Sequence, residues 1–162
     1  MADPRYPIGK FSFEGPLRDD QRIEFLEDIE QAPARLKGAV KGLTAQQLDT
    51  PYRDGGWTVR QVVHFKLALT EEEPTIRPYM EDRWAELPEA KTAPIELSLS
   101  LLEDLHKRWI LMLRAIQPAE WKRTFRHPEI GPMTLEKNLA LYAWHGRHHV
   151  AHVTALRERM GW

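Results

Sequence analysis

The sequence predicts an all-α protein, a bundle of four main helices with a long crossover between the second and the third. Apolar residues recur at helical spacing in residues 19–42, 95–116 and 135–161, and a period near 3.6 residues is the primary signature of an amphipathic helix. Prolines gather instead in residues 1–18 and 74–94, where they interrupt regular structure. Helices that each bury one apolar face pack together as a bundle.

The first part of the chain is expected to be an irregular arm, residues 1–18, that lies over the domain. The first helix then runs from Asp19 to about Gly42. Pro33 stands in its middle and either kinks one helix or begins a second. Residues 44–47 read Thr-Ala-Gln-Gln, a capping-box pattern that predicts a short helical turn.

The second main helix is expected to begin at Thr58, because Thr58 and Gln61 repeat the capping-box pattern. Its apolar residues first follow helical spacing, with His64 beside them. After His64 the helical period breaks and apolar residues alternate along the chain. The second helix is therefore predicted to be short.

The third and fourth helices have clearer boundaries. Pro94 lies near the first turn of the third helix. Its predicted apolar stripe consists of Ser98, Leu101, Leu102, Leu105, Trp109, Met112, Leu113 and Ile116. Residues 125–132 predict a loop or a small hairpin, and Thr134 is expected to cap the last helix, which runs up to Gly161.

Composition limits the classes of protein. A chain of 162 residues is sized for one domain, residues 1–162, and its net charge of −1 argues against nucleic acid or an acidic membrane as partner. The absence of cysteine excludes disulfides, cysteine-ligated zinc and thiol nucleophiles. The chain begins without the apolar run of a signal peptide, and no segment is long enough to span a membrane. A cytoplasmic location is the default expectation.

A histidine cluster is the strongest functional signal. Four of the seven histidines fall within residues 145–152. His145 and His149 stand at i and i+4 and share one helix face, which His152 also shares, whereas His148 points about a quarter-turn away. Burying several unpaired imidazoles would cost a few kcal/mol each, and a bound metal removes that cost. A metal site is therefore favoured over a surface patch of histidines.

Two imidazoles are too few for a tight metal site, so a third ligand is needed. His64 is the best candidate, because bundles build metal sites from side chains on facing helices. Three imidazoles with one open position form a catalytic type of zinc site, and nickel accepts the same ligands. His152 would then hydrogen-bond a ligand or shuttle protons.

The most distinctive motifs of the sequence are residues 6–11, 50–64, 127–129 and 141–152. Together they resemble the YfiT group, a branch of the DinB superfamily whose members are expected to be metal-dependent hydrolases, and the likeness covers nearly the whole chain. This resemblance implies a DinB-like four-helix bundle, a zinc or nickel ion held by three histidines from two helices, a cytoplasmic location and a homodimer. By motif, His145 and His149 match the paired ligands of the family, and His64 matches its first.

The sequence departs from the family at two places. His64 is followed directly by Phe65, where the second helix of the family continues for about a dozen residues, or about 18 Å of helix. Either the chain is a deletion variant or its ends at this point are not covalently adjacent, and a truncated helix would displace His64. Met80 stands where the family more often has an acidic residue.

The leading hypothesis is a metal-dependent hydrolase of a small molecule, with His64, His145 and His149 holding the metal and a bound water as nucleophile. There are two alternatives, a thiol S-transferase that uses a bacillithiol-type cofactor and a metal-binding bundle without turnover. An anion pocket near the metal, formed by Arg53, Arg60 or Arg147, would favour the transferase. The substrate does not follow from the sequence, and the general base stays open among Glu81, Asp82, Glu136 and His152.

Overall fold

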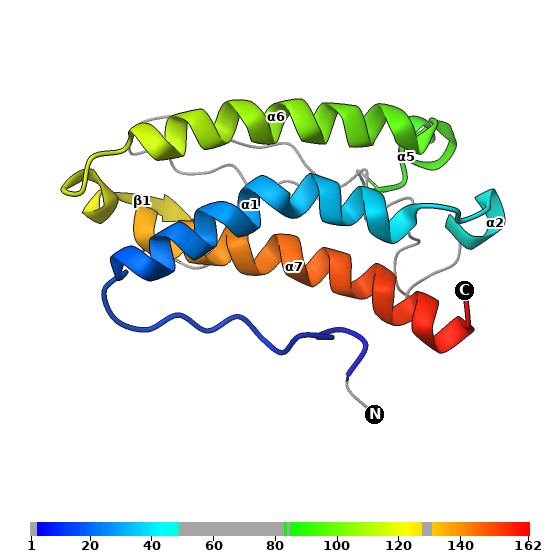
Figure 1. Ribbon diagram of the computed structural model, residues 1–162, viewed down its shortest axis with the longest axis horizontal. Coiled ribbons are helices and arrows are strands. Elements are labelled where there is room, and N and C mark those ends of the chain that lie inside the picture. Colours follow the sequence, from blue (N-terminus) through cyan, green and yellow to red (C-terminus); the bar gives the residue numbers. More distant parts are fainter. Residues whose placement is uncertain (1–2, 49–82, 84, 128–130) are drawn as a thin grey trace.

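The computed structural model describes residues 3–48, 83, 85–127 and 131–162. Its elements are α1 (Asp19–Val40), α2 (Ala45–Leu48), α5 (Pro88–Thr92), α6 (Ile95–Ala115), a 3-10 turn (Glu120–Lys122), β1 (Thr124–His127), β2 (Gly131–Thr134) and α7 (Leu135–Met160). Three long helices, α1, α6 and α7, lie side by side (Figure 1). The all-α prediction is confirmed, while the predicted second main helix and residues 74–82 and 84 of the crossover lie outside the described residues.

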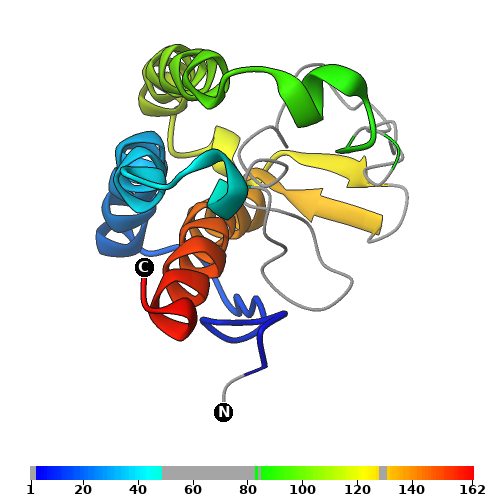
Figure 2. The ribbon, with the colours of Figure 1, turned by 90° about the vertical axis from the view of Figure 1, so that its right-hand side faces the viewer.

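The core of the described part lies between the three long helices. α1 lies between α6 and α7 and packs against both (Figure 2). One buried cluster, around Leu36, Leu102 and Leu156, joins the helices toward the carboxyl end of α1. A second cluster, around Ile29 and Ile110, joins them toward its amino end. α7 is thereby held on α1 along most of its length.

Local chemistry sets the helix ends much as the sequence predicts. The Thr134 hydroxyl accepts a hydrogen bond from the Lys137 amide at 3.2 Å, and Gly161 ends α7 with a φ of 71°. The capping box of Thr44 and Gln47 is present, with both reciprocal hydrogen bonds. α1 continues through Pro33 as a single helix, so the alternative in which Pro33 begins a second helix is wrong.

The predicted stripe of α6 is wrong in part. Leu101 and Met112 are exposed, at 54% and 48%. The buried stripe instead includes His106 and Ile110, which lie about one helical turn from the buried Leu102 and Leu113 respectively. Apolar side chains occupy more than one face of α6, so the sequence pattern alone does not select the face that meets α1. The His106 ring is satisfied within its own helix, because Nδ1 lies 2.9 Å from the Leu102 carbonyl oxygen.

Two further segments frame α7. β1 and β2 form an antiparallel hairpin between α6 and α7, which confirms the hairpin alternative for residues 125–132. Residues 3–18, called the arm below, form no helix or strand and run along the side of α7 that faces away from α6 (Figures 1 and 2). Among the described helices, none is long and apolar enough to cross a membrane.

Candidate metal centre

Two imidazole nitrogens meet on one face of α7. His145 and His149 are one helical turn apart, and their Nε2 atoms lie 2.8 Å from each other. The ring centroids are 4.2 Å apart at an interplanar angle of 77°. His149 is buried at 9% exposure and His145 is half-buried. Two neutral imidazoles that aim Nε2 at the same place offer two adjacent ligand positions, so the donor set fits a transition metal.

The other two histidines of the cluster turn toward the arm. His148 and His152 form a second pair one turn apart, with ring centroids separated by 4.2 Å. The His148 ring stacks on Trp144 at 4.3 Å and faces Tyr6 of the arm at 6.2 Å. His148 therefore belongs to an aromatic stack between α7 and the arm, which agrees with its predicted offset from His145 and His149.

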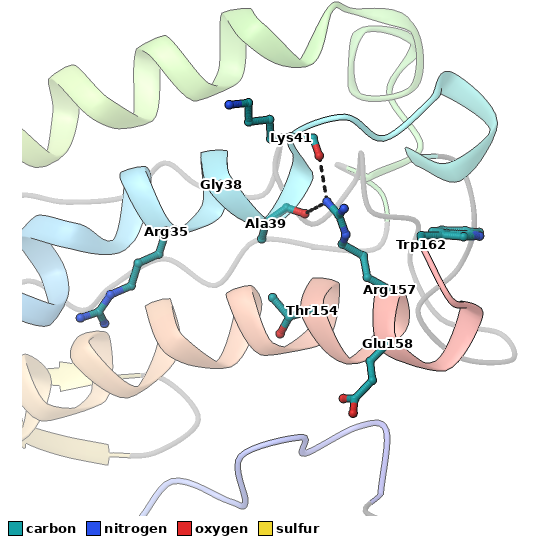
Figure 3. A pocket seen from close by; sticks show the side chains of 8 residues that line it. All are labelled: Arg35, Gly38, Ala39, Lys41, Thr154, Arg157, Glu158 and Trp162. Carbon is teal, nitrogen blue, oxygen red and sulfur yellow. Dashed lines mark hydrogen bonds between the residues drawn. The ribbon is translucent and has the colours of Figure 1, made fainter.

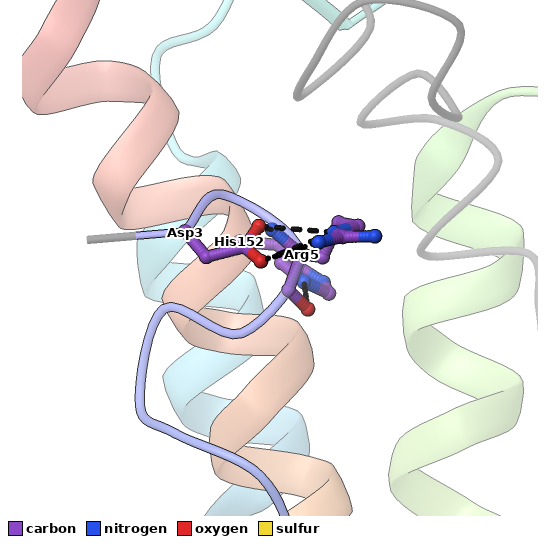
Figure 4. Close-up of polar contacts among 3 residues, drawn as sticks. All are labelled: Asp3, Arg5 and His152. Atoms are coloured by element: carbon purple, nitrogen blue, oxygen red, sulfur yellow. Dashed lines mark hydrogen bonds and ion pairs between the residues drawn. The ribbon is translucent and has the colours of Figure 1, made fainter. Parts of the chain in front are cut away.

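His152 is held by the backbone of the arm. Its Nε2–H donates to the carbonyl oxygen of Arg5 at 3.3 Å (Figure 4). The turn that presents this carbonyl is closed by Asp3, whose carboxylate accepts from the Arg5 guanidinium at 2.8 Å to 3.1 Å. The His152 ring lies 5.8 Å from that of His149, centroid to centroid. The arm thus fixes one ring nitrogen of His152.

Burial makes His148 a pH-sensitive group. The pKa of the His148 imidazole is lowered from its ordinary 6.5 to about 4, first because burial disfavours the charged ring and then because His152 lies beside it. An unfolded chain therefore binds more protons than the folded one between these two values. By linkage, the stability contributed by a neutral His148 is complete above pH 6.5 and is lost as the pH falls toward 4.

We expect His148→Phe to reduce the acid sensitivity of the metal-free protein. Phenylalanine keeps the ring stack on Trp144, but its side chain cannot be protonated. Between about pH 7.5 and about pH 5, the free energy of unfolding should fall by about 2 kcal/mol less in the variant than in the parent chain. Urea unfolding in the presence of a chelator measures both differences. Equal losses in the two proteins would contradict this assignment.

The structure places the predicted site residues unevenly. It brings His145 and His149 together, whereas His64, Met80, Glu81 and Asp82 lie outside the described residues. Within the described ranges, no group of three His, Cys, Asp or Glu side chains is arranged to hold a metal ion. The predicted third ligand therefore stays a prediction. Among the base candidates, Glu136 lies in the first turn of α7, about 14 Å along the helix axis from His145, too far to act at this pair.

Arg147 is committed to α1. Its guanidinium pairs with the Asp28 carboxylate, which is 93% buried by the packing of α1 and α7. Arg35 binds the other oxygen of the same carboxylate at 2.7 Å. The sequence did not single out Asp28, and the only available signal was an acidic residue next to the apolar Ile29 on the inner face of α1. Arg147 is thus not an open anion site, while Arg53 and Arg60 lie outside the described residues.

A surface groove at the far end of α7 is also structural. It is lined by Arg35, Gly38, Ala39, Lys41, Thr154, Arg157, Glu158 and Trp162. Arg157 donates to the carbonyl oxygens of Ala39 and Lys41 at 2.8 Å and 2.9 Å, which satisfies the last carbonyls of α1 (Figure 3). Arg35 and Lys41 point away from Arg157 rather than toward a common point. The groove therefore offers a helix cap and no focused charge.

The fold and the histidine pair define a helical bundle with a candidate transition-metal site on its last helix. Residues 28–153 match the profile of the DinB superfamily, and the chain belongs to that superfamily. The solved structure of YfiT from Bacillus subtilis, described as a probable metal-dependent hydrolase with an unusual four-helix bundle topology, aligns with a TM-score of 0.91 and 48% identity over 98% of each chain. The predicted family and four-helix bundle are confirmed.

Curated relatives agree over their full length. A protein of Bacillus mycoides (strain KBAB4) named "Putative metal-dependent hydrolase" is 50% identical, with all of both chains covered. One of the same name from Bacillus cereus (strain 03BB102) is 49% identical, again with complete coverage. These names imply a metal in the relatives and leave its identity open.

The relatives are longer than this chain. The match to the Bacillus mycoides protein spans 174 positions, whereas this chain has 162 residues. Twelve positions of the relative therefore have no counterpart here. That number agrees with the stretch of about a dozen residues expected to be missing after His64, although the place of the gap stays a prediction.

Proposed function

We propose that this chain is a metal-dependent hydrolase of a small molecule, with its metal held by His145, His149 and His64. The observation that carries the proposal is the convergence of the His145 and His149 Nε2 atoms, 2.8 Å apart on one face of a buried helix. The names of the full-length relatives support the same class of activity. His64 enters the proposal as the third ligand because it matches the first ligand of the family by motif.

Each residue of the site has a defined task in this proposal. His145 and His149 bind through Nε2, which requires the tautomer with its proton on Nδ1. A divalent ion bound there supplies a water ligand with a pKa near neutrality. His152 donates Nε2–H to the Arg5 carbonyl, so in its neutral form Nδ1 is free of a proton and can accept one. This makes His152 the proton shuttle of the proposed reaction.

Zinc is the first choice of metal and nickel the second, since three imidazoles suit either ion. Location in the cytoplasm and assembly as a homodimer belong to the same proposal. The thiol S-transferase is the weaker alternative, because its charged cofactor needs a nearby cation and Arg147 is already paired with Asp28. A bundle without turnover remains the outcome if metal binds and no substrate reacts.

The experiment is a comparison of metal forms on defined substrates. Protein stripped with a chelator and reloaded with zinc or nickel is assayed on aryl esters, amides and phosphodiesters, and in parallel on an electrophilic arene with a bacillithiol-type thiol. We expect hydrolysis only in a reloaded form, and its loss in the His145→Ala/His149→Ala double variant, which controls for contaminating enzymes. Thiol conjugation without any hydrolysis would overturn the hydrolase assignment in favour of the transferase.

A further inference from the structure

A buried carboxylate links α1 to the histidine helix. Asp28 is 7% exposed and lies on the face of α1 that meets α7. It accepts hydrogen bonds from two guanidinium groups. One belongs to Arg35, about two helical turns further along α1, and the other to Arg147 on α7. A carboxylate in this setting is costly unless it is fully paired. The link to Arg147 crosses between helices, whereas the link to Arg35 stays within α1.

The two helices approach each other closely beside this ion pair. A Cβ atom built on Gly146 would lie 3.0 Å from the Cβ of Ala32. Ala32 follows Asp28 by one helical turn, and Gly146 directly precedes Arg147. Two consecutive residues of α7 therefore contact two residues on one face of α1. A methyl group at Gly146 would force the helices apart by a few tenths of an ångström.

These contacts determine the direction of the histidine pair. Successive residues of a helix point about 100° apart, so Gly146 and Arg147 face α1 while His145 and His149 face another side. An imidazole nitrogen stands roughly 6 Å from the helix axis, so a turn of α7 by about 15° would move it by 1–2 Å. Metal–ligand distances vary by only about 0.2 Å around their usual values.

We propose that Asp28, Arg147 and the Ala32–Gly146 contact are positioning residues, which fix the rotation of α7 on α1 and so aim His145 and His149 at the metal. The inference rests on the proposed metal site. Arg35 makes the test practicable, because Asp28 keeps one cation when Arg147 is removed. Arg35 also supplies a matched control, since its loss removes an equal charge from Asp28 and its own hydrogen bonds, to Asp28 and Gln31, stay within α1.

The first test compares Arg147→Ala with Arg35→Ala. Zinc affinity is measured by competition with a chromogenic chelator, and stability of the metal-free form by urea unfolding. We expect Arg147→Ala to lower zinc affinity by roughly tenfold or more, the usual effect of losing a group that orients a ligand. Arg35→Ala should change it less than about twofold. Equal losses of affinity in the two variants would overturn the proposal.

The second test uses glycine. Gly146→Ala should lower zinc affinity, whereas Gly38→Ala on α1, where an added Cβ meets no atom within 4 Å, should leave it unchanged. Equal effects of the two substitutions would again contradict the inference.

A readout without metal separates this inference from the proposed function. Imidazole nitrogen shifts of His145 and His149 are recorded by NMR in chelated protein. We expect Arg147→Ala to move both sets of signals and Arg35→Ala to leave them in place. If the parent chain bound no metal but these shifts still occurred, the positioning role would stand and the metal proposal would fall. Unmoved signals in Arg147→Ala would refute the positioning role itself.

Discussion

His149→Ala should abolish tight metal binding. The parent chain is expected to take up one zinc or nickel ion, and a ligand that binds only the folded state stabilises it by about 2.7 kcal/mol at one hundred times its dissociation constant. His149 is buried, and its Nε2 atom lies 2.8 Å from that of His145. The substitution to alanine therefore removes one of the two imidazole ligands on α7. We expect the affinity to fall by about two orders of magnitude or more.

Metal content by elemental analysis and the metal-induced shift of thermal unfolding measure this loss. His152→Ala is the matched control, because His152 is equally buried, follows His149 by one turn and binds the arm through its Nε2. The control should retain the metal and its stabilising effect. If both substitutions removed metal to the same degree, the four histidines would act as a diffuse imidazole patch, and the assignment of His145 and His149 as a specific pair would be wrong.

The sequence predicts this pair because its geometry is local. An i, i+4 spacing brings two side chains together on any helix, and the helix itself is bounded by Thr134 and Gly161, whose capping chemistry is equally local. The offset of His148 from His145 and His149 follows from the same 100° step, although His152, predicted to share the face of that pair, lies closer to His148. Such features need no knowledge of the rest of the chain.

The surroundings of the pair could not be predicted in this way. Arg147 and Asp28 are 119 residues apart in the sequence. Only the packing of α1 on α7 brings their charged side chains together in a buried contact. Likewise, His152 is held by the backbone carbonyl of Arg5. Every residue has such a carbonyl, so the sequence could not show which one binds His152. The error in α6 has a related cause, since its apolar residues outnumber the positions that α1 can cover.

Restoring the missing stretch should complete the metal site. The Bacillus mycoides relative has twelve positions without a counterpart in this chain, and the break in helical period predicts that the gap falls between His64 and Phe65. Twelve residues correspond to about 18 Å of helix and to a rotation of about 120° for everything that follows. If the gap lies there, the shortened second helix would not keep both His64 and the residues beyond Phe65 in the register of the longer relative.

We therefore expect a chain with the relative's twelve residues inserted after His64 to bind zinc at least about tenfold more tightly than the present chain, because a second helix of full length would orient His64, the proposed third ligand, better toward the pair. Chelator competition measures the difference, and a twelve-residue Gly-Ser insert at the same point controls for added length. His64→Ala in the lengthened chain should cancel the gain. An unchanged affinity after insertion would mean either that His64 already reaches the pair from the shortened helix or that the third ligand is another residue. His64→Ala in the present chain separates these two cases, because it weakens zinc binding only in the first.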